Sequence, residues 1–455
     1  MPHDPVPALL SRATELLEAE FAVLPAFESA ADLGAMERVL TDTAHRLGDN
    51  YPYFHPLYAG QMLKPPHPVA RAAYALAMKV NPNNHSRDGG RVSSEMEIEA
   101  VDEIARMFGW AESAGSYLGH LTSNGTIANL EALWVAGQLT PGKRIVGSEQ
   151  AHFTHHRISA VLRLEFTSVA ADGSGRMSLE TLETELGRGD VGTVVVTLGT
   201  TAIGAVDRLD EVLKLRDRYG FRVHVDAAYG GYFKLIAEQL DEGARRAFAA
   251  TVEADSLVID PHKHGLQPYG CGCVLFRDPA VGRLYKHDSP YTYFTSKELH
   301  LGEISLECSR AGAAAVALWA TQQLLPLTPG GEFARGLATG RAAALDLYQR
   351  LRADGGGETL AAGAPELDIV VWRLKASDSE QASELAQKIF AACAARDLHL
   401  ALVQLPLFWF EAGKTAQDGP VKCLRSVLMK PEHAAWMDRI WERYSAAYDE
   451  VVGGA

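Results

Sequence analysis

Cysteine is scarce in this sequence, with five residues among 455. An odd and scattered set does not provide the paired framework that stabilises small secreted proteins, so we expect a reducing compartment. Cys271 and Cys273 would share one face of a strand. No second pair accompanies them to complete a metal site, and the simpler interpretation is a pair of buried thiols.

Long hydrophobic runs and an excess of positive charge are also lacking. The most apolar run, Ala311–Ala320, is too short to cross a bilayer. The N-terminal segment contains Glu15, Glu18 and Glu20 and has no apolar core of the kind found in signal peptides. The net charge of −14 disfavours a nucleic-acid or anionic-membrane surface. We therefore expect a cytoplasmic protein without nucleic-acid or membrane partners.

Short β-branched runs alternate with helix-like segments from Glu95 onward, which predicts a mostly parallel sheet with helices on both faces. The clearest of these runs are Arg144–Gly147, Val194–Leu198, Arg222–Val225 and Ser256–Ile259. In such α/β sheets, ligands gather at the carboxyl ends of the strands. The first candidate site is therefore the set of residues that follow these runs.

The chain is longer than one typical core, so we expect more than one domain. The loose stretch Pro326–Gly331 separates the α/β pattern from later strands and helices that read as a small α+β domain. We expect an N-terminal helical and extended segment (1–90), a large cofactor-binding domain (91–325) and a small C-terminal domain (326–455). Within the first, Val6–Phe27 has a helical apolar stripe, and Tyr51–Pro68 reads as a proline-rich ordered loop.

Lys263 lies in a turn rich in proline and glycine between two β-like runs. Most lysines are solvated surface charges, but an apolar setting at such a turn would favour a neutral amine that can attack a carbonyl. Asp226 ends an apolar strand, and the small residues after it leave room for a flat ring. A lysine for a Schiff base and an acid that keeps a pyridine nitrogen protonated are what pyridoxal phosphate (PLP) chemistry requires.

The motif HVDAAYGG around Asp226, with DPHK downstream, resembles the group II PLP-dependent amino-acid decarboxylases, which include aromatic-L-amino-acid, glutamate and aspartate decarboxylases. The likeness runs from about Pro56 to Val451. It implies the type I aminotransferase fold, with a mostly parallel seven-stranded sheet in the large domain. It also implies a homodimer with the active site at the subunit interface, in which the N-terminal segment packs on the partner and the segment 51–68 lines the substrate mouth.

The resemblance assigns further residues to the cofactor. Gly125 and Thr126, at the start of a helix, match the phosphate cup, although an ordinary N-cap by Ser123 or Asn124 would explain the same pattern. A second group is implied to contact the ring or the substrate carboxylate: His152, Thr201, Ala228 and His262.

Several polar residues near these motifs have more than one interpretation. His155 and His156 could suggest a metal site, but surface or satisfied histidines are commoner, so we expect no metal. Asp260, where many family members have asparagine, is expected to bond backbone donors in its turn. Arg425 could bind a substrate carboxylate or form a salt bridge in the small domain.

The family delivers a proton from a loop tyrosine after CO2 leaves, and Tyr291 and Tyr293 are both candidates here. Either could instead be a packing aromatic. Ser309 and Arg310, after this loop, resemble a pair that opens the next helix and serves structure or a partner contact.

These residues predict a PLP enzyme in which Lys263 holds the cofactor and an L-amino acid is decarboxylated to an amine. The main alternative is a carbon–carbon lyase of the sphingosine-phosphate-lyase type, which also carries D-x-HK. A PLP-binding protein without turnover is an alternative of another class. The sequence leaves the substrate open: the aromatic mouth suits an aromatic amino acid, but aromatic residues also line sites for acidic and aliphatic ones.

Overall fold

The computed structural model describes residue 4 and residues 6–27, 31–111, 116–286, 305–411 and 413–453. Its largest feature is a seven-stranded sheet in the order β1-β7-β6-β5-β4-β2-β3. The strands are β1 (Leu118–Thr122), β2 (Arg144–Ser148), β3 (Phe166–Val169), β4 (Val191–Thr197), β5 (Arg222–Asp226), β6 (Ser256–Ile259) and β7 (Gly272–Phe276). Strands β3, β2, β4, β5 and β6 pair in parallel, and β7 runs antiparallel to both β6 and β1. The predicted fold, a mostly parallel seven-stranded sheet with a smaller α+β unit after it, is confirmed.

Alternation along β6 shows why this sheet has helices on both faces. Leu257 and Ile259 point into the largest hydrophobic core, whereas Val258 points the other way, against Ala128 and Ala132 of helix α6. Because both faces are covered, the strands read as continuous apolar runs. The helical segments of this part are α5 (Val92–Met107), α6 (Gly125–Leu139), α7 (Thr154–Leu162), α8 (Leu179–Leu186), α9 (Leu209–Tyr219), η1 (Gly231–Gln239), α10 (Glu242–Ala249), η2 (Ala250–Glu253), η3 (Pro279–Leu284) and α11 (Gly312–Leu324).

A second sheet, of four antiparallel strands, lies near the C-terminus in the order β10-β11-β9-β8. Its strands are β8 (Gly357–Thr359), β9 (Ile369–Leu374), β10 (Ala401–Pro406) and β11 (Pro420–Val427), with helices α12 (Glu332–Asp354), α13 (Ser379–Ala394) and α14 (Glu432–Gly453) and the short turns η5 (Leu407–Trp409) and η6 (Ala416–Asp418). Trp372 anchors its core and donates a hydrogen bond from Nε1 to the Tyr444 hydroxyl at 3.0 Å. Helix α13 begins at Ser379, where Asp378 caps it by accepting from Gln381 N at 2.8 Å.

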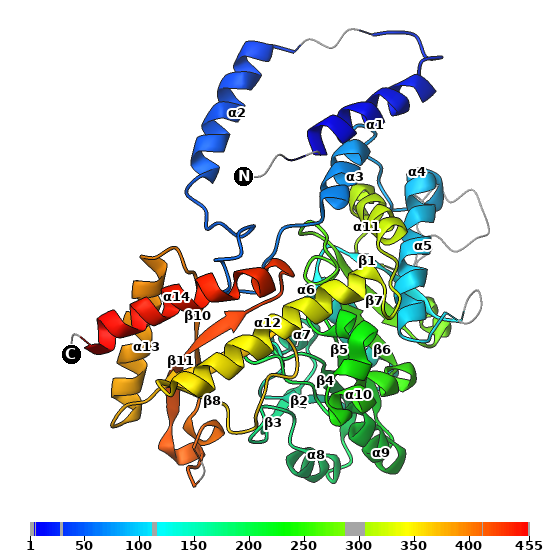
Figure 1. Cartoon of the computed structure of the whole chain (residues 1–455). Coiled ribbons are helices and arrows are strands. Elements are labelled where there is room, and N and C mark those ends of the chain that lie inside the picture. Colours follow the sequence, from blue (N-terminus) through cyan, green and yellow to red (C-terminus); the bar gives the residue numbers. More distant parts are fainter. Residues whose placement is uncertain are drawn as a thin grey trace.

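The N-terminal helices are α1 (Val6–Glu20), α2 (Leu33–Leu47), α3 (Pro68–Met78) and the short α4 (Arg87–Gly90). Helix α1 packs on α3, and α3 packs on α11. Helix α2 stands apart from the body of the protein, and none of its residues is buried (Figure 1). Its exposed apolar residues are Leu33, Met36, Val39, Leu40 and Leu47. This helix was not predicted from the sequence. The expected domain boundaries, after residues 90 and 325, stay predictions.

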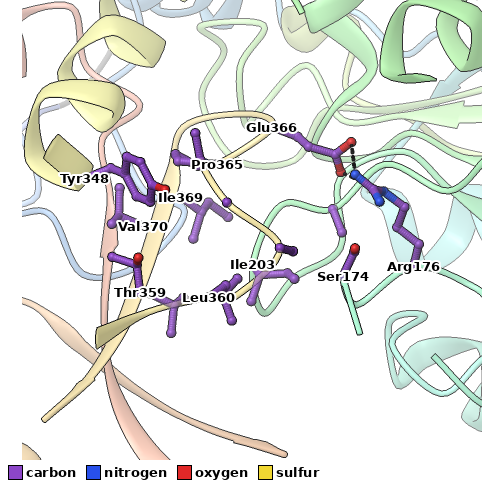
Figure 2. Close-up of a pocket in the computed structure, with 15 residues that line it drawn as sticks. Ser174, Arg176, Ile203, Tyr348, Thr359, Leu360, Pro365, Glu366, Ile369 and Val370 are labelled. Carbon is purple, nitrogen blue, oxygen red and sulfur yellow. Dashed lines mark hydrogen bonds and ion pairs between the residues drawn. The ribbon is translucent and has the colours of Figure 1, made fainter. Parts of the chain in front are cut away.

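An ion pair joins the large sheet to the small one. Arg176, between β3 and α8, lies 2.7 Å from Glu366, which precedes β9 (Figure 2). Glu366 also accepts from Val206 N at 2.8 Å and lies 3.4 Å from Arg208. The cavity beside this pair is only about 40 Å³. The contacts of Glu366 therefore serve to hold the loop after β4 against the small sheet.

No helix in the described ranges is both long and apolar enough to cross a membrane.

Candidate active site

The carboxyl ends of β4, β5 and β6 meet at one cavity of about 210 Å³. It is lined by Asn124, Gly125, Thr126, Asn129, His152, Thr154, Thr197, Gly199, Thr201, Asp226, Ala228, Tyr229, Asp260, His262 and Lys263. Every residue that the sequence assigned to the cofactor is in this group. Five neighbours were not singled out for the cavity: Asn129, Thr154, Thr197, Gly199 and Tyr229.

Asp226 is buried at the end of β5 and is paired with His155, which is also buried. His155 Nε2 lies 2.8 Å from Asp226 Oδ2, and Ala228 N donates to Oδ1 at 3.1 Å. Burial alone would raise the pKa of Asp226, but the hydrogen bond and charge of His155 and the charge of Lys263 outweigh it and hold the pKa well below its usual value. An ionised carboxylate only accepts, so His155 Nε2 is the donor.

The expectation of surface or satisfied histidines is confirmed for this pair, because His155 is bonded to a buried carboxylate and His156 lies on the surface. The buried residues of α7 are Thr154, His155, Ile158 and Ser159, and the last three follow helical spacing, while His156 is exposed and bonds Ser168 at 3.1 Å. This spacing was the signal in the sequence that His155 points inward.

Lys263 points its amine at a carboxylate and does not sit in the apolar setting that we expected. Its Nζ lies 3.0 Å from Asp260 Oδ2, and its side chain is 22% exposed. Among the described residues, no backbone N–H donates to the Asp260 side chain, contrary to expectation. Its Oδ1 is buried and makes no hydrogen bond to the part of the chain that is described. The cavity therefore contains a paired lysine amine and, beside it, one carboxylate oxygen without a hydrogen bond in the described ranges.

Helix α6 begins directly beneath this pair. Asn124 caps it by accepting from Ile127 N at 3.1 Å, while the N–H groups of Gly125 and Thr126 have no intrahelical partner. A Cβ at Gly125 would lie 2.5 Å from Asp260 Oδ1. Glycine is thus required here because the turn after β6 approaches the helix closely. The N-cap interpretation holds for Asn124, and the phosphate cup at Gly125 and Thr126 stays a prediction.

The two cavity histidines have defined tautomers. His262 Nδ1 donates to the Cys271 carbonyl at 2.7 Å, and His152 Nδ1 accepts from Thr154 N at 3.2 Å. Burial is the largest influence on both and lowers the pKa of His152 and of His262. Both rings are therefore neutral near pH 7, with Nε2 an acceptor in His262 and a donor in His152.

Comparison with known proteins decides the family. The model of the pyridoxal-dependent decarboxylase conserved domain matches residues 50–375. The chain belongs to this family. It is a PLP-dependent amino-acid decarboxylase, that is, a carboxy-lyase, by this membership.

The relatives of this decarboxylase act on chemically different amino acids. It is 26% identical to an L-tyrosine decarboxylase of Enterococcus faecium over 78% of this chain and 75% of that protein. It is 34% identical to an L-2,4-diaminobutyrate decarboxylase of Rhizobium meliloti over 47% of this chain and 44% of that protein. A crystal structure of Oryza sativa TDC with PLP and tryptamine superposes with a TM-score of 0.78, at 18% identity, over 98% of this chain and 95% of that chain.

The cavity of this decarboxylase fits PLP. Free N–H groups at the start of α6 suit a phosphate, and the ionised Asp226 suits a protonated ring nitrogen. Thr197 Oγ1 is buried without a hydrogen bond in the described ranges. Such orphaned polar atoms are uncommon in a cavity that has no ligand to receive.

Arg425 fulfils neither of the two roles that the sequence suggested, a substrate-carboxylate ligand or a salt bridge. It does not line the cavity and forms no salt bridge in the described part. Its guanidinium donates to three backbone carbonyls, of Thr201 at 2.7 Å, Ala202 at 2.9 Å and Gly60 at 3.2 Å. Arg425 therefore fastens the loop after β4 to the small sheet, and these donors are not free for a substrate carboxylate.

The candidate loop tyrosines, Tyr291 and Tyr293, lie outside the described residues. Arg310, after that loop, pairs with Glu97 and donates to the Leu121 carbonyl at 2.7 Å. These contacts support the structural role that was one of the two expectations for Arg310.

Proposed function

We propose that this protein decarboxylates an L-amino acid to the corresponding amine and CO2, with PLP attached to Lys263. The observation that carries the proposal is that Lys263 and an ionised Asp226 line the same cavity as the uncapped N–H groups of α6. An amine, an acid for the ring nitrogen and a phosphate cradle are the three attachments that PLP needs.

When bound, PLP supplies an electron sink for the pair of electrons that the departing CO2 leaves at the α-carbon. Gly125 and Thr126 would hold its phosphate, and His152 and Ala228 would flank its ring. Thr201 and His262 would orient the substrate carboxylate. Orientation matters because only the bond perpendicular to the ring is activated.

The chain's own groups manage charge and protons around this reaction. His155 donates to Asp226 and keeps that carboxylate ionised, which favours a protonated nitrogen on any ring beside it. Asp260 lies close enough to Lys263 Nζ to accept the proton that the lysine must lose before it attacks a carbonyl. Tyr291 or Tyr293 would return a proton to the α-carbon.

The carbon–carbon lyase is the rival within the same cofactor chemistry, and the DPHK motif fits both. The named decarboxylases among the relatives favour decarboxylation. The test is to incubate the PLP-loaded protein with L-tyrosine, L-2,4-diaminobutyrate, L-glutamate and L-aspartate and to measure CO2 and amine. Stoichiometric CO2 and amine from one of them is expected. Aldehyde release from a phosphorylated amino alcohol without any CO2 would overturn the proposal.

A protein that binds PLP without turnover is distinguished by the variant Lys263→Ala. We expect the absorbance band of lysine-bound cofactor to disappear in this variant together with CO2 release. A band with no CO2 release from any amino acid in the wild type would favour the binding protein, and a band that persists in Lys263→Ala would exclude this lysine.

We also propose a homodimer in which α1 and α2 pack on the partner subunit. Helix α2 has a row of exposed apolar residues and no buried one, which an isolated subunit would not favour. The mass in solution, by light scattering, should be twice that of the chain. Met36→Lys with Leu40→Lys on α2 should shift the mass toward the monomer, whereas a monomeric wild type would contradict the proposal.

A further inference from the structure

A second and larger cavity, of about 430 Å³, shares no lining residue with the cofactor cavity. Its walls come from the proline-rich segment 64–68, the residues just after Lys263, the first turns of α12 and the segment that leads into α14. Cavities of this size hold small molecules in other proteins.

Two lysines from distant segments line this cavity. Lys430 is 2% exposed, and its Nζ donates to the Tyr58 carbonyl at 2.6 Å. Lys64 is half-buried, and its Nζ lies 3.4 Å from the Met429 carbonyl. An ammonium has three donors, and in the described part of the chain each of these makes only one hydrogen bond. The remaining donors are available to a ligand.

His264 is the third group and the one that most needs a partner. It is 1% exposed and lines the same cavity. Tyr229 and Phe233 pack edge-on against its ring, with centroids at 4.7 and 5.0 Å. Its Nε2 lies 3.3 Å from Asp368 Oδ2, but neither ring nitrogen makes a hydrogen bond to any described residue. A buried imidazole in this state is a costly feature unless something binds to it.

Helix α12 adds backbone donors. It begins at Glu332, which lines the cavity, and its N-cap, Gly331, provides no side-chain cap. A 23-residue helix with uncapped N–H groups attracts an anion. Glu332 and Glu432 also line the cavity and oppose an anion, while Arg335 supports one and His67 adds a further imidazole.

We propose that this cavity is a second ligand site, separate from the cofactor site, that binds a small oxyanion (a phosphate or a carboxylate) between Lys64, Lys430 and His264. The oxyanion accepts from the two ammonium groups and from whichever ring nitrogen of His264 carries the proton. It also compensates the excess of donors over acceptors that the three side chains create. The inference does not depend on the reaction that the cofactor site performs.

The charge state of the lysines supports this site. Burial, with the charge of Lys64, lowers the pKa of Lys430 to about 7, and burial lowers the pKa of Lys64 to about 8. Burial also keeps His264 and His67 neutral, since it lowers the pKa of each. A bound anion favours the ammonium forms, so its affinity should fall as the pH rises through 7 and 8. Glu332, Glu432, Asp368 and Arg335 are the other charged groups that face the lysines and His264.

The test is isothermal titration calorimetry of the whole chain at pH 6.5 and constant ionic strength, with inorganic phosphate in one arm and succinate in the other. Each arm is repeated with saturating PLP, because heat that survives PLP does not come from the phosphate cradle on α6. One saturable site is expected in at least one arm, and the arm that responds identifies phosphate or carboxylate. Lys64→Met and Lys430→Met should each weaken it tenfold or more. The surface variant Lys214→Met, on α9, should not change it.

The absence of saturable binding in both arms would overturn the proposal, as would equal affinity in the wild type and both lysine variants. Since Lys430 also holds the Tyr58 carbonyl, Lys430→Arg serves as a variant that keeps the charge and should retain binding. A measurement without any variant is available in wild-type crystals soaked in selenate. An anomalous selenium peak between Lys64, Lys430 and His264 is expected, and no peak there would contradict the site.

Discussion

His155 donates from Nε2 to Asp226 Oδ2 at 2.8 Å, and both side chains are buried at the carboxyl end of β5. A buried carboxylate without a partner would take up a proton, because burial raises its pKa. Asp226, which we propose pairs with the ring nitrogen of PLP, is therefore held in its charged form by a residue three positions after His152, on the first turn of α7.

Replacing His155 with phenylalanine should remove this support. We expect kcat/KM for CO2 release to fall roughly 10- to 100-fold, as ~1–3 kcal/mol of hydrogen bonding to a buried charged group is lost. The folded pKa of Asp226 lies below its unfolded value, so this carboxylate stabilises the fold above the unfolded pKa and loses that contribution as the pH falls. Urea unfolding of His155→Phe should therefore depend less on pH between 5 and 3. His156→Phe, on the exposed face, is the control, and equal effects of the two would contradict the role.

Replacing Asp260 with asparagine should strengthen cofactor binding. The carboxylate lies against Gly125, where the phosphate is proposed to sit, and like charges repel. We expect the PLP dissociation constant, from fluorescence quenching, to fall about tenfold, the equivalent of ~1.4 kcal/mol. The rate of cofactor attachment to Lys263 should drop, because the proton acceptor is gone. Weaker PLP binding in Asp260→Asn would show that the carboxylate helps to hold the cofactor.

Replacing Gly125 with alanine should damage the site through packing. The new Cβ would lie 2.5 Å from Asp260 Oδ1, so the buried carboxylate that pairs with Lys263 must shift. We expect a loss of ~1–3 kcal/mol in the free energy of unfolding, typical of overpacking, together with weaker PLP binding. Gly187→Ala is the matched control, because a Cβ there meets its nearest neighbour at 3.5 Å. If both variants unfold at the same denaturant concentration as the wild type, the close contact between Gly125 and Asp260 would be contradicted.

The buried His224 should make the protein sensitive to acid. It lies between Asn129 and Ser256, at 2.8 and 2.9 Å, and burial lowers its pKa to about 3. A lowered folded pKa gives stability that is present above the unfolded value and is lost as the pH falls from about 6.5 toward 3. As the pH falls from 7.5 to 5.5, this residue should lower the free energy of unfolding by ~1.4 kcal/mol. His224→Gln should lose that part of the pH dependence in urea unfolding, and an unchanged slope would contradict the assignment.

The sequence predicted the large sheet well because its strands are buried on both faces and read as unbroken apolar runs. It also predicted which residues meet, since Asp226 and Asp260 both follow such strands, and Lys263 is three residues further on. These expectations need only the rule that parallel strands end at the same edge.

The remaining features depend on contacts that no local pattern reveals. Helix α2 is an exception, because Asp32 caps it and its apolar residues recur at helical spacing, so its sequence could have predicted it. The environment of Lys263 was misjudged because Asp260 turns its side chain toward the lysine and away from the backbone. Arg425 was expected to bind a substrate carboxylate or to form a salt bridge, but its three acceptors are backbone carbonyls from two segments far away in the sequence.

Lys263 and His264 are adjacent in the chain yet line different cavities. A Cβ at Gly265 would come within 2.6 Å of Pro261, so the turn that follows these two residues is closely packed. Tyr229, which lines the first cavity, donates to Asp368 at 2.6 Å beside His264. An anion in the second cavity would therefore bind beside the turn that carries Lys263, the residue that we propose holds PLP.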